Sequence, residues 1–209
     1  MTNKAHEIYL EPTFFFDFNS QIVQDFVKQH TNEVQTPAEK ARNLFNAVRD
    51  GWFYSPYNLY EDRAMLKASA IMKREKGHCQ DKACILITCF RAINLPSRLH
   101  LAKVVNHIAV EELTEKLGTK ELTPHASVQV FLNDKWLDVV PAFNRELCDK
   151  LGVDCLEFDG QNDALFQQFD KEGNQFMEYI EDYGLFTDYP YDFVRTNLME
   201  HYPDVIKWQ

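Results

Sequence analysis

The feature that most constrains the fold is an apolar segment that opens on Cys79. Its apolar residues recur with helical spacing at Ala83, Leu86, Ile87 and Phe90. A helix of this kind is stable only when its apolar side packs against another layer of structure. The segment therefore predicts a core helix that begins at or near Cys79.

Two amphipathic segments, 21–30 and 37–51, precede this helix. The second has the clearest start, because Thr36 can cap it, Pro37 suits the first helical position and Glu39 completes a capping box. Both segments are therefore expected to be helices.

Segments that alternate between apolar and polar residues follow the cysteine helix. Residues 96–105, 125–132 and 135–140 predict strands, and Asn133-Asp134 is a strong signal for a hairpin between the last two. Helices followed by antiparallel strands are typical of the α+β class. The sequence therefore predicts an α+β fold.

The two ends of the chain carry weaker patterns. Residues 6–18 contain β-type residues with partial alternation, which favours an N-terminal strand or extended arm. Pro190 is expected to start a closing helix. The residues expected to pack inward from that helix are Phe193, Val194 and Leu198.

The composition favours one ordinary globular unit. The chain has 209 residues, of which 45% are hydrophobic, and only seven glycines and eight prolines, with no linker-like stretch. We therefore expect a single domain over 1–209. The net charge of −10 repels phosphate backbones and anionic lipid surfaces, so neither a nucleic acid nor a membrane is an expected partner.

The N-terminal residues lack the apolar core of a signal peptide, and no apolar run approaches the roughly 18 residues that span a bilayer. These features predict a cytoplasmic location. In that reducing compartment the five cysteines are expected to be thiols. No metal or other cofactor is expected, because the chain has no CxxC pair, scattered histidines and no EF-hand-type acidic loop.

The position of Cys79 suits a nucleophile. At a helix start, unpaired backbone N–H groups and the positive end of the helix dipole favour the thiolate, which is the reactive form. Gly77 just before it would allow a substrate backbone to approach. The alternative is a cysteine that is simply buried at a helix boundary.

A cysteine nucleophile needs a base, which need not be near in sequence. Of the seven histidines, His125 is the best placed, because it opens a predicted strand directly after Pro124. His78 is next to Cys79, but adjacent side chains at a helix start usually diverge. His100 and His107 are expected to be structural.

Two longer stretches resemble known sequence motifs. GHCQDKACILITCFRAINLPSRL (77–99) resembles the Gly-x-Cys, apolar helix and Arg-Ala-x-x-x-Pro-x-Arg pattern of the transglutaminase-like superfamily. HASVQVFLNDKWLDVVPAFN (125–144) resembles the partner His-Ala strand, turn and Trp of that superfamily. Parts of the extension over 145–209 resemble a bacterial subgroup labelled cysteine proteases.

The resemblance implies a papain-like α+β fold, with a Cys-bearing core helix packed on an antiparallel sheet. It also implies that Cys79 is the nucleophile, that its backbone N–H contributes to an oxyanion hole and that His125 is the base. One position departs from the pattern, because the superfamily usually has an Asp where this chain has Val140. Asn144 and Asp138 are the two candidates for orienting the His125 ring in its place.

Three other residues have structural interpretations. Trp136 is expected to pack in the hairpin and Arg98 to pair with an acid. Gln80 is expected on the helix surface, with help to an oxyanion hole as its alternative role.

The expected function is acyl transfer on a peptide or protein amide through a thioester on Cys79, most simply completed by water. Two alternatives remain open at this point. One is an inactive transglutaminase-like module that binds a peptide or partner. The other is an acyl-CoA-dependent N-acetyltransferase, although the acidic surface suits CoA phosphates poorly. The sequence gives no prediction of oligomeric state.

Overall fold

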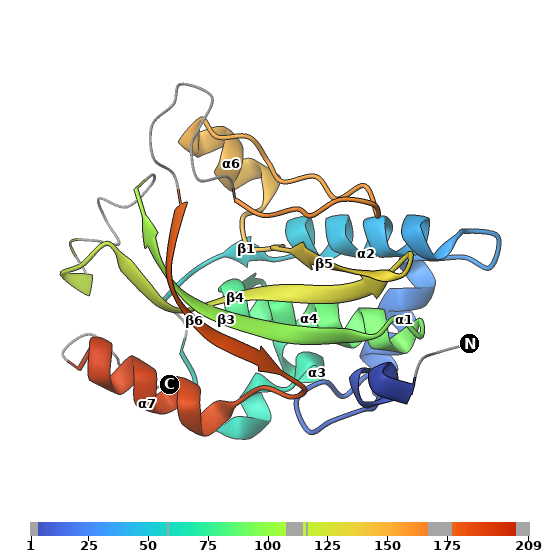
Figure 1. Ribbon diagram of the computed structural model, residues 1–209, viewed down its shortest axis with the longest axis horizontal. Coiled ribbons are helices and arrows are strands. Elements are labelled where there is room, and N and C mark those ends of the chain that lie inside the picture. The colour runs from blue at the N-terminus through green and yellow to red at the C-terminus, as the bar shows by residue number, and fades with distance from the viewer. Residues whose placement is uncertain (1–3, 58, 108–114, 116, 167–176, 204–209) are drawn as a thin grey trace.

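The computed structural model describes residues 4–57, 59–107, 115, 117–166 and 177–203 (Figure 1). Its centre is a four-stranded antiparallel sheet in the order β5-β4-β3-β6. The strands are β3 (Ser97–Asn106), β4 (Glu121–Leu132), β5 (Lys135–Val139) and β6 (Met177–Phe186). The predicted α+β class is confirmed.

Helices cover one face and the two edges of this sheet (Figure 1). Their bounds are α1 Gln21–His30, α2 Pro37–Gly51, α3 Ala68–Ile71, α4 Cys79–Ala92, α6 Arg145–Leu151 and α7 Tyr191–His201. Two 3₁₀ helices, η1 (Lys4–Tyr9) and η2 (Arg63–Leu66), and a parallel pair of short strands, β1 (Phe53–Tyr54) and β2 (Lys76–Gly77), complete the described elements.

The cysteine helix α4 is the core element of the molecule. It lies behind the sheet in Figure 1 and contacts β3 and β4 on one side and α1, α2 and α3 on the others. Every residue from Cys79 to Arg91 is buried, so α4 has no solvent-facing side over that length. The polar residues that it carries must therefore find partners inside the protein.

One of these polar residues is Lys82, whose side chain is fully buried. Its Nζ donates hydrogen bonds to the carbonyl oxygens of Arg49 at 2.7 Å, Trp52 at 3.0 Å and Ala142 at 2.7 Å. Lys82 thus joins the end of α2 to the segment that follows β5.

Two short sequence motifs form the structures that were predicted from them. Thr36 Oγ1 accepts from the Glu39 N–H at 3.3 Å and the Glu39 carboxylate accepts from the Thr36 N–H at 2.8 Å, which confirms the capping box. Asn133 and Asp134 have φ of 52° and 61°, the left-handed pair that a two-residue hairpin turn requires.

Residues 6–18 were expected to form a strand or an extended arm. Residues 4–9 instead form η1, and residues 10–18 form turns and irregular segments without a strand. This short helix covers the outer face of the hairpin, where Tyr9 stacks edge-on against Trp136 at 5.3 Å between ring centroids. Trp136 also faces the Arg98 guanidinium at 3.9 Å. In the described structure Arg98 donates to Gln129 and to the Tyr9 hydroxyl, whereas an acidic partner was expected.

The closing helix α7 is confirmed, and Val194 and Leu198 are buried as predicted. Phe193 is 37% exposed and does not belong to this inward set. It instead packs beside Phe186, with ring centroids 6.0 Å apart.

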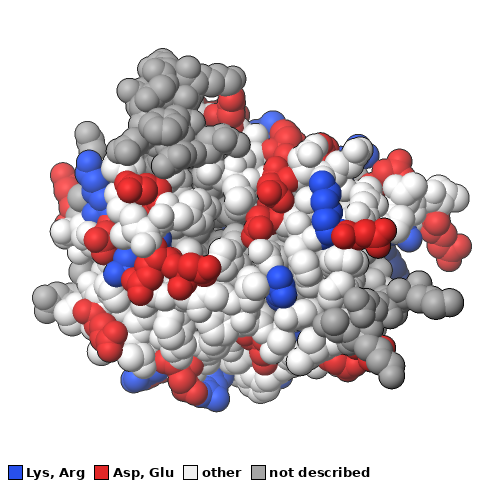
Figure 2. Space-filling model, in the orientation of Figure 1, with Lys and Arg blue, Asp and Glu red and all other residues white. Residues whose placement is uncertain are grey.

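The surface is rich in carboxylates, and Figure 2 shows acidic side chains spread over the sheet side of the molecule with fewer basic ones among them. No helix in the described part of the chain has the length and apolar character needed to cross a membrane.

Candidate active site

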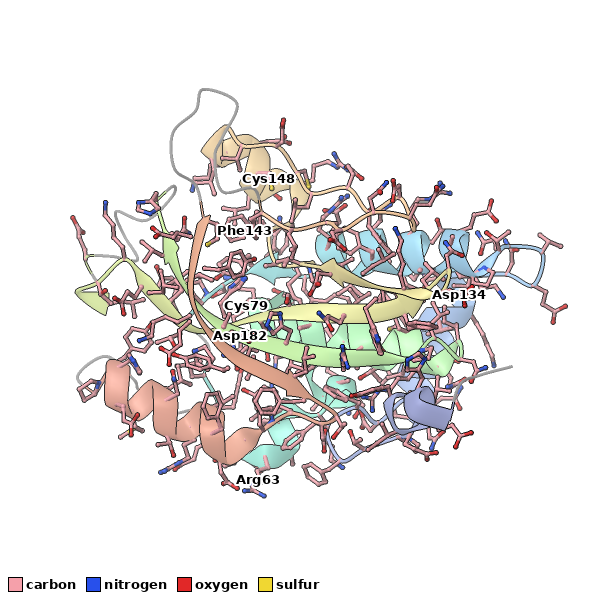
Figure 3. All side chains as sticks on the ribbon, viewed as in Figure 1. Arg63, Cys79, Asp134, Phe143, Cys148 and Asp182 are labelled. Carbon is pink, nitrogen blue, oxygen red and sulfur yellow. The ribbon has the colours of Figure 1, made fainter. Side chains whose placement is uncertain are left out.

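Cys79 is the first residue of α4 and is 9% exposed (Figure 3). Burial raises the pKa of its thiol, and the backbone N–H groups of Ala126 and Gln80 act in the opposite direction. Ala126 belongs to β4 and Gln80 to the helix start, so two separate elements act on the thiol.

The preceding residue, His78, is the N-cap of α4. Its Nδ1 accepts from the Gln80 backbone N–H at 3.2 Å, while the His78 backbone N–H donates to Asp81 Oδ2 at 3.1 Å. This capping role agrees with the expectation that His78 would not be the base for Cys79. The sequence signal was available, because an acid three residues after the cap completes the box.

The helix start docks on an edge of β4 that β5 leaves uncovered. β5 pairs with β4 only from Val128 to Leu132. On the N-terminal side of Val128, Gln80 Nε2 donates to the Pro124 carbonyl at 2.8 Å, and the Ala126 N–H acts to lower the pKa of Cys79. The two anchoring residues on β4 flank His125 in the chain.

His125 itself is 4% exposed. Neither of its ring nitrogens has a hydrogen-bond partner within the described structure. The fold thus brings the strand of His125 against the start of α4, but no hydrogen bond joins its imidazole to the Cys79 thiol. The assignment of His125 as the base stays a prediction.

Burial dominates the electrostatics of both groups. It raises the pKa of Cys79 to about 11, because desolvation outweighs the backbone N–H donors and nearby Asp81 adds to the rise. Burial also lowers the pKa of His125 to about 4, with a smaller contribution from the charge of His100. At neutral pH the resting site therefore holds a thiol and a neutral imidazole, not the thiolate that the helix start alone would favour.

The two candidates for the orienting residue have other partners. Asn144 caps α6 and its Oδ1 accepts from the Tyr54 N–H at 3.1 Å. Asp138 Oδ2 accepts from Gln129 Nε2 at 3.1 Å, and Oδ1 lies 3.8 Å from His100 Nδ1. Neither is hydrogen-bonded to His125 in the described structure, so an orienting role for either remains a prediction.

Val140, at the position where the motif usually has an acid, is buried, and its N–H donates to the Ala164 carbonyl at 2.9 Å. Its side chain offers no hydrogen-bonding group. The structure therefore supplies no replacement for the missing acid at this position.

His100 forms a separate polar cluster on the sheet. Its Nε2 lies 3.0 Å from Asp182 Oδ1, and its Nδ1 lies 3.3 Å from the Ser127 hydroxyl. Hydrogen bonding to Asp138 and Asp182 raises the pKa of His100 despite its partial burial. His100 therefore joins β3, β4, β5 and β6, in keeping with its expected structural role.

Gln80 was expected on the helix surface, and this prediction was wrong, because the side chain is 5% exposed. Its Oε1 accepts a hydrogen bond from the Tyr189 hydroxyl, while its Nε2 holds Pro124. Gln80 thus ties the Cys79 helix both to β4 and to the segment before α7. Tyr189 lies far away in sequence, so no local pattern could have revealed this contact.

Within the described residues, no three His, Cys, Asp or Glu side chains come together as ligands for a metal ion.

Comparison with known proteins identifies the family. The family model of the transglutaminase-like superfamily matches residues 24–141, more than half of the chain. The chain belongs to the transglutaminase-like superfamily. The matched region runs from α1 to the end of β5 and contains both Cys79 and His125. Membership in this superfamily is consistent with a cysteine-based catalytic role.

Among solved structures, this transglutaminase-like chain is similar to a protein from Cytophaga hutchinsonii described as a "putative cysteine protease". The TM-score is 0.50 at 12% identity, over 88% of this chain and 54% of that one. The chain thus spans about half of that protein's length, and the likeness shows a shared fold. No curated protein matches the sequence.

The geometry gives Gln80 a testable role in holding the site together. Gln80→Leu leaves the Pro124 carbonyl and the Tyr189 hydroxyl without their buried partner, so we expect a loss of about 1–3 kcal/mol in the free energy of unfolding. Tyr189→Phe removes only one of these bonds and should cost less. Urea denaturation measures both. Equal stability of Gln80→Leu and wild type would contradict this role.

Proposed function

We propose that the chain transfers acyl groups from amide or peptide bonds through a thioester on Cys79, with His125 as the base and water as the usual acceptor. The observation that carries this proposal is the docking of the α4 start on β4. Gln80, the residue after the buried Cys79, is hydrogen-bonded to Pro124, the residue before His125.

The chemistry starts from the neutral pair. The Cys79 sulfur attacks the amide carbonyl carbon, and its proton moves to the imidazole of His125 as the S–C bond forms. The carbonyl oxygen becomes an oxyanion, and the backbone N–H of Cys79 at the helix start is suited to stabilise it. The imidazolium then protonates the departing amine as the C–N bond breaks, which leaves the thioester.

The second half of the reaction releases the acyl group. Neutral His125 removes a proton from water, the water oxygen attacks the thioester carbonyl, and the Cys79 sulfur leaves and recovers its proton from the imidazolium. An amine in place of water would give cross-linking. Hydrolysis is proposed because small bacterial-type domains of the superfamily resemble hydrolases more than cross-linking enzymes.

Incubation with a proteome-derived peptide library and a biotinylated primary amine tests the reaction. The proposal expects new peptide termini or side-chain deamidation by mass spectrometry, and none of these with Cys79→Ala. Biotin transfer in place of these products would overturn the preference for water.

A second candidate function is a module that binds a peptide without cleaving it. The unbonded ring nitrogens of His125 and the apolar Val140 at the usual acid position favour this alternative. The same library distinguishes the two functions. Enrichment of peptides on immobilised wild-type protein, with no new termini and with equal enrichment on Cys79→Ala, would support the binding module.

A further inference from the structure

Two cysteines outside the candidate active site, Cys148 and Cys155, lie on either side of a turn that reverses the chain. Cys148 is buried in α6, and this helix ends at Gly152, which has a φ of 67°. The Val153 N–H donates to the Cys148 carbonyl at 3.0 Å and the Gly152 N–H to the Asp149 carbonyl at 3.3 Å. These two bonds form a Schellman motif, which turns the chain back along the helix.

The returning chain carries Cys155 back to Cys148. Cys155 is two residues beyond Val153, so in an extended segment their side chains point to the same side. The returning chain stays beside α6, because Arg145 Nη2 in this helix donates to Glu157 Oε1 at 2.6 Å. Cys155 therefore lies between two contacts with α6, one at Val153 and one at Glu157. Each of the two cysteines also contributes to the pKa shift of the other. Both are free thiols in this structure. Two thiols that a fixed turn holds near each other are suited to reversible cross-linking.

The two sulfurs differ in environment. The Cys148 side chain is fully buried, with its sulfur 4.0 Å from the Phe143 carbonyl, whereas Cys155 is partly exposed. Burial raises the pKa of Cys155, and the guanidinium groups of Arg49 and Arg145 act against this rise. Arg49 also fixes the adjacent backbone by donating to the Leu156 carbonyl at 2.6 Å. Cys155 is therefore the sulfur that a reagent from solvent meets first.

We propose that Cys148 and Cys155 form a redox-sensitive pair that closes into an intramolecular disulfide when a low-molecular-weight disulfide oxidises it. This inference uses neither Cys79 nor His125, so it stands or falls independently of the proposed acyl transfer.

The reaction balances as two thiol–disulfide exchanges. The Cys155 thiolate attacks one sulfur of the small disulfide, which forms a mixed disulfide and expels one small thiolate. The Cys148 thiolate then attacks the Cys155 sulfur and expels the second small thiolate. The two cysteines lose two electrons and two protons in total, and the small disulfide is reduced to two thiols. Burial raises the pKa of both cysteines, so the exchange should be faster at pH 8.5 than at pH 7.

The test incubates the native full chain with oxidised glutathione at pH 8.5, followed by alkylation and digestion with trypsin without reduction. Trypsin cleaves after Lys150, so Cys148 and Cys155 fall in separate peptides that a disulfide would link. In wild type we expect the linked peptide pair as the main product, reversed by dithiothreitol. Cys148→Ala should instead retain glutathione on Cys155, and Cys155→Ser should leave Cys148 unmodified.

The outcomes separate the proposal from its rivals. Glutathione that remains on Cys155 in wild type would show that Cys148 does not resolve the mixed disulfide, and would overturn the proposal. A linked pair seen only after unfolding in urea would overturn it as well, because the native turn would then not bring the thiols together. Circular dichroism of both variants identifies any that fail to fold, and the wild-type result decides the question by itself.

Discussion

Cys79→Ala is expected to reduce the turnover of any amide substrate by about 10⁴-fold or more, because the thioester cannot form without the sulfur. The substitution removes one sulfur atom from a buried helix start and leaves the backbone N–H groups in place. Substrate binding should therefore change much less than turnover. Mass-spectrometric counts of new peptide termini in the library assay measure the effect.

Cys155→Ser is the matched control for this experiment. Cys155 is partly exposed and lies outside the proposed site, so its replacement should leave turnover within about twofold of wild type. Unchanged turnover in a folded Cys79→Ala protein would contradict the proposed function, whatever the Cys155 variant does. Thermal unfolding of both variants shows whether they are folded.

Lys82→Met is expected to give the largest loss of stability, a decrease of about 3 kcal/mol in the free energy of unfolding at pH 8. The three carbonyls that Lys82 Nζ contacts, those of Arg49, Trp52 and Ala142, would lose their donor inside the core. Methionine fills a similar volume, so the loss reports on the hydrogen bonds more than on packing. Lys73→Met, on an exposed position, should change the stability by less than about 0.5 kcal/mol.

The same variant carries a pH signature. Burial lowers the pKa of Lys82 to about 7 in the folded chain, from an ordinary value of 10.5. Between these two values the unfolded chain binds one more proton at this site, so the contribution of Lys82 to stability rises with pH. The stability gap between wild type and Lys82→Met should therefore widen from pH 7 to pH 10 in urea denaturation. A gap that is constant or narrows would contradict this linkage.

Elements with a strong local signal could be predicted from the sequence. The capping box at Thr36 and the turn at Asn133-Asp134 depend on neighbours within a few residues, so their chemistry is written in one short stretch. The prediction for the N-terminal segment failed because its structure depends on contacts with distant residues. Its residues suit a strand, yet residues 4–9 form a 3₁₀ helix in which His6 packs on Phe131 and Tyr9 on Trp136. Both of these partners lie far along the chain.

The polar residues of α4 were also difficult to place from the sequence. The helical pattern predicted a surface position for Gln80, and this prediction fails because helices and the sheet surround α4 on every side. The partners of the Gln80 and Lys82 side chains come from segments 30 or more residues away in the chain. Polar residues in a fully buried helix could be placed only once those segments were located.

For the site, the paired motifs predicted which strand meets the start of α4. They could not predict the protonation of Cys79 and His125, because burial depends on the whole fold and outweighs the helix start. They also could not replace the acid missing at Val140, since Asn144 and Asp138 are each bonded elsewhere in this structure.

The most direct test of the central claim is the rate at which p-nitrophenyl acetate acetylates Cys79, followed from pH 5 to 9 by mass spectrometry in wild type and His125→Ala. If His125 is the base, its pKa of about 4 predicts a rate that is nearly level across this range. The His125→Ala variant should then be slower by about 10²-fold or more. An isolated thiol with a pKa of about 11 would instead react faster as the pH rises. A rate that rises in this way, and that is equal in wild type and His125→Ala, would contradict the pairing of Cys79 with His125.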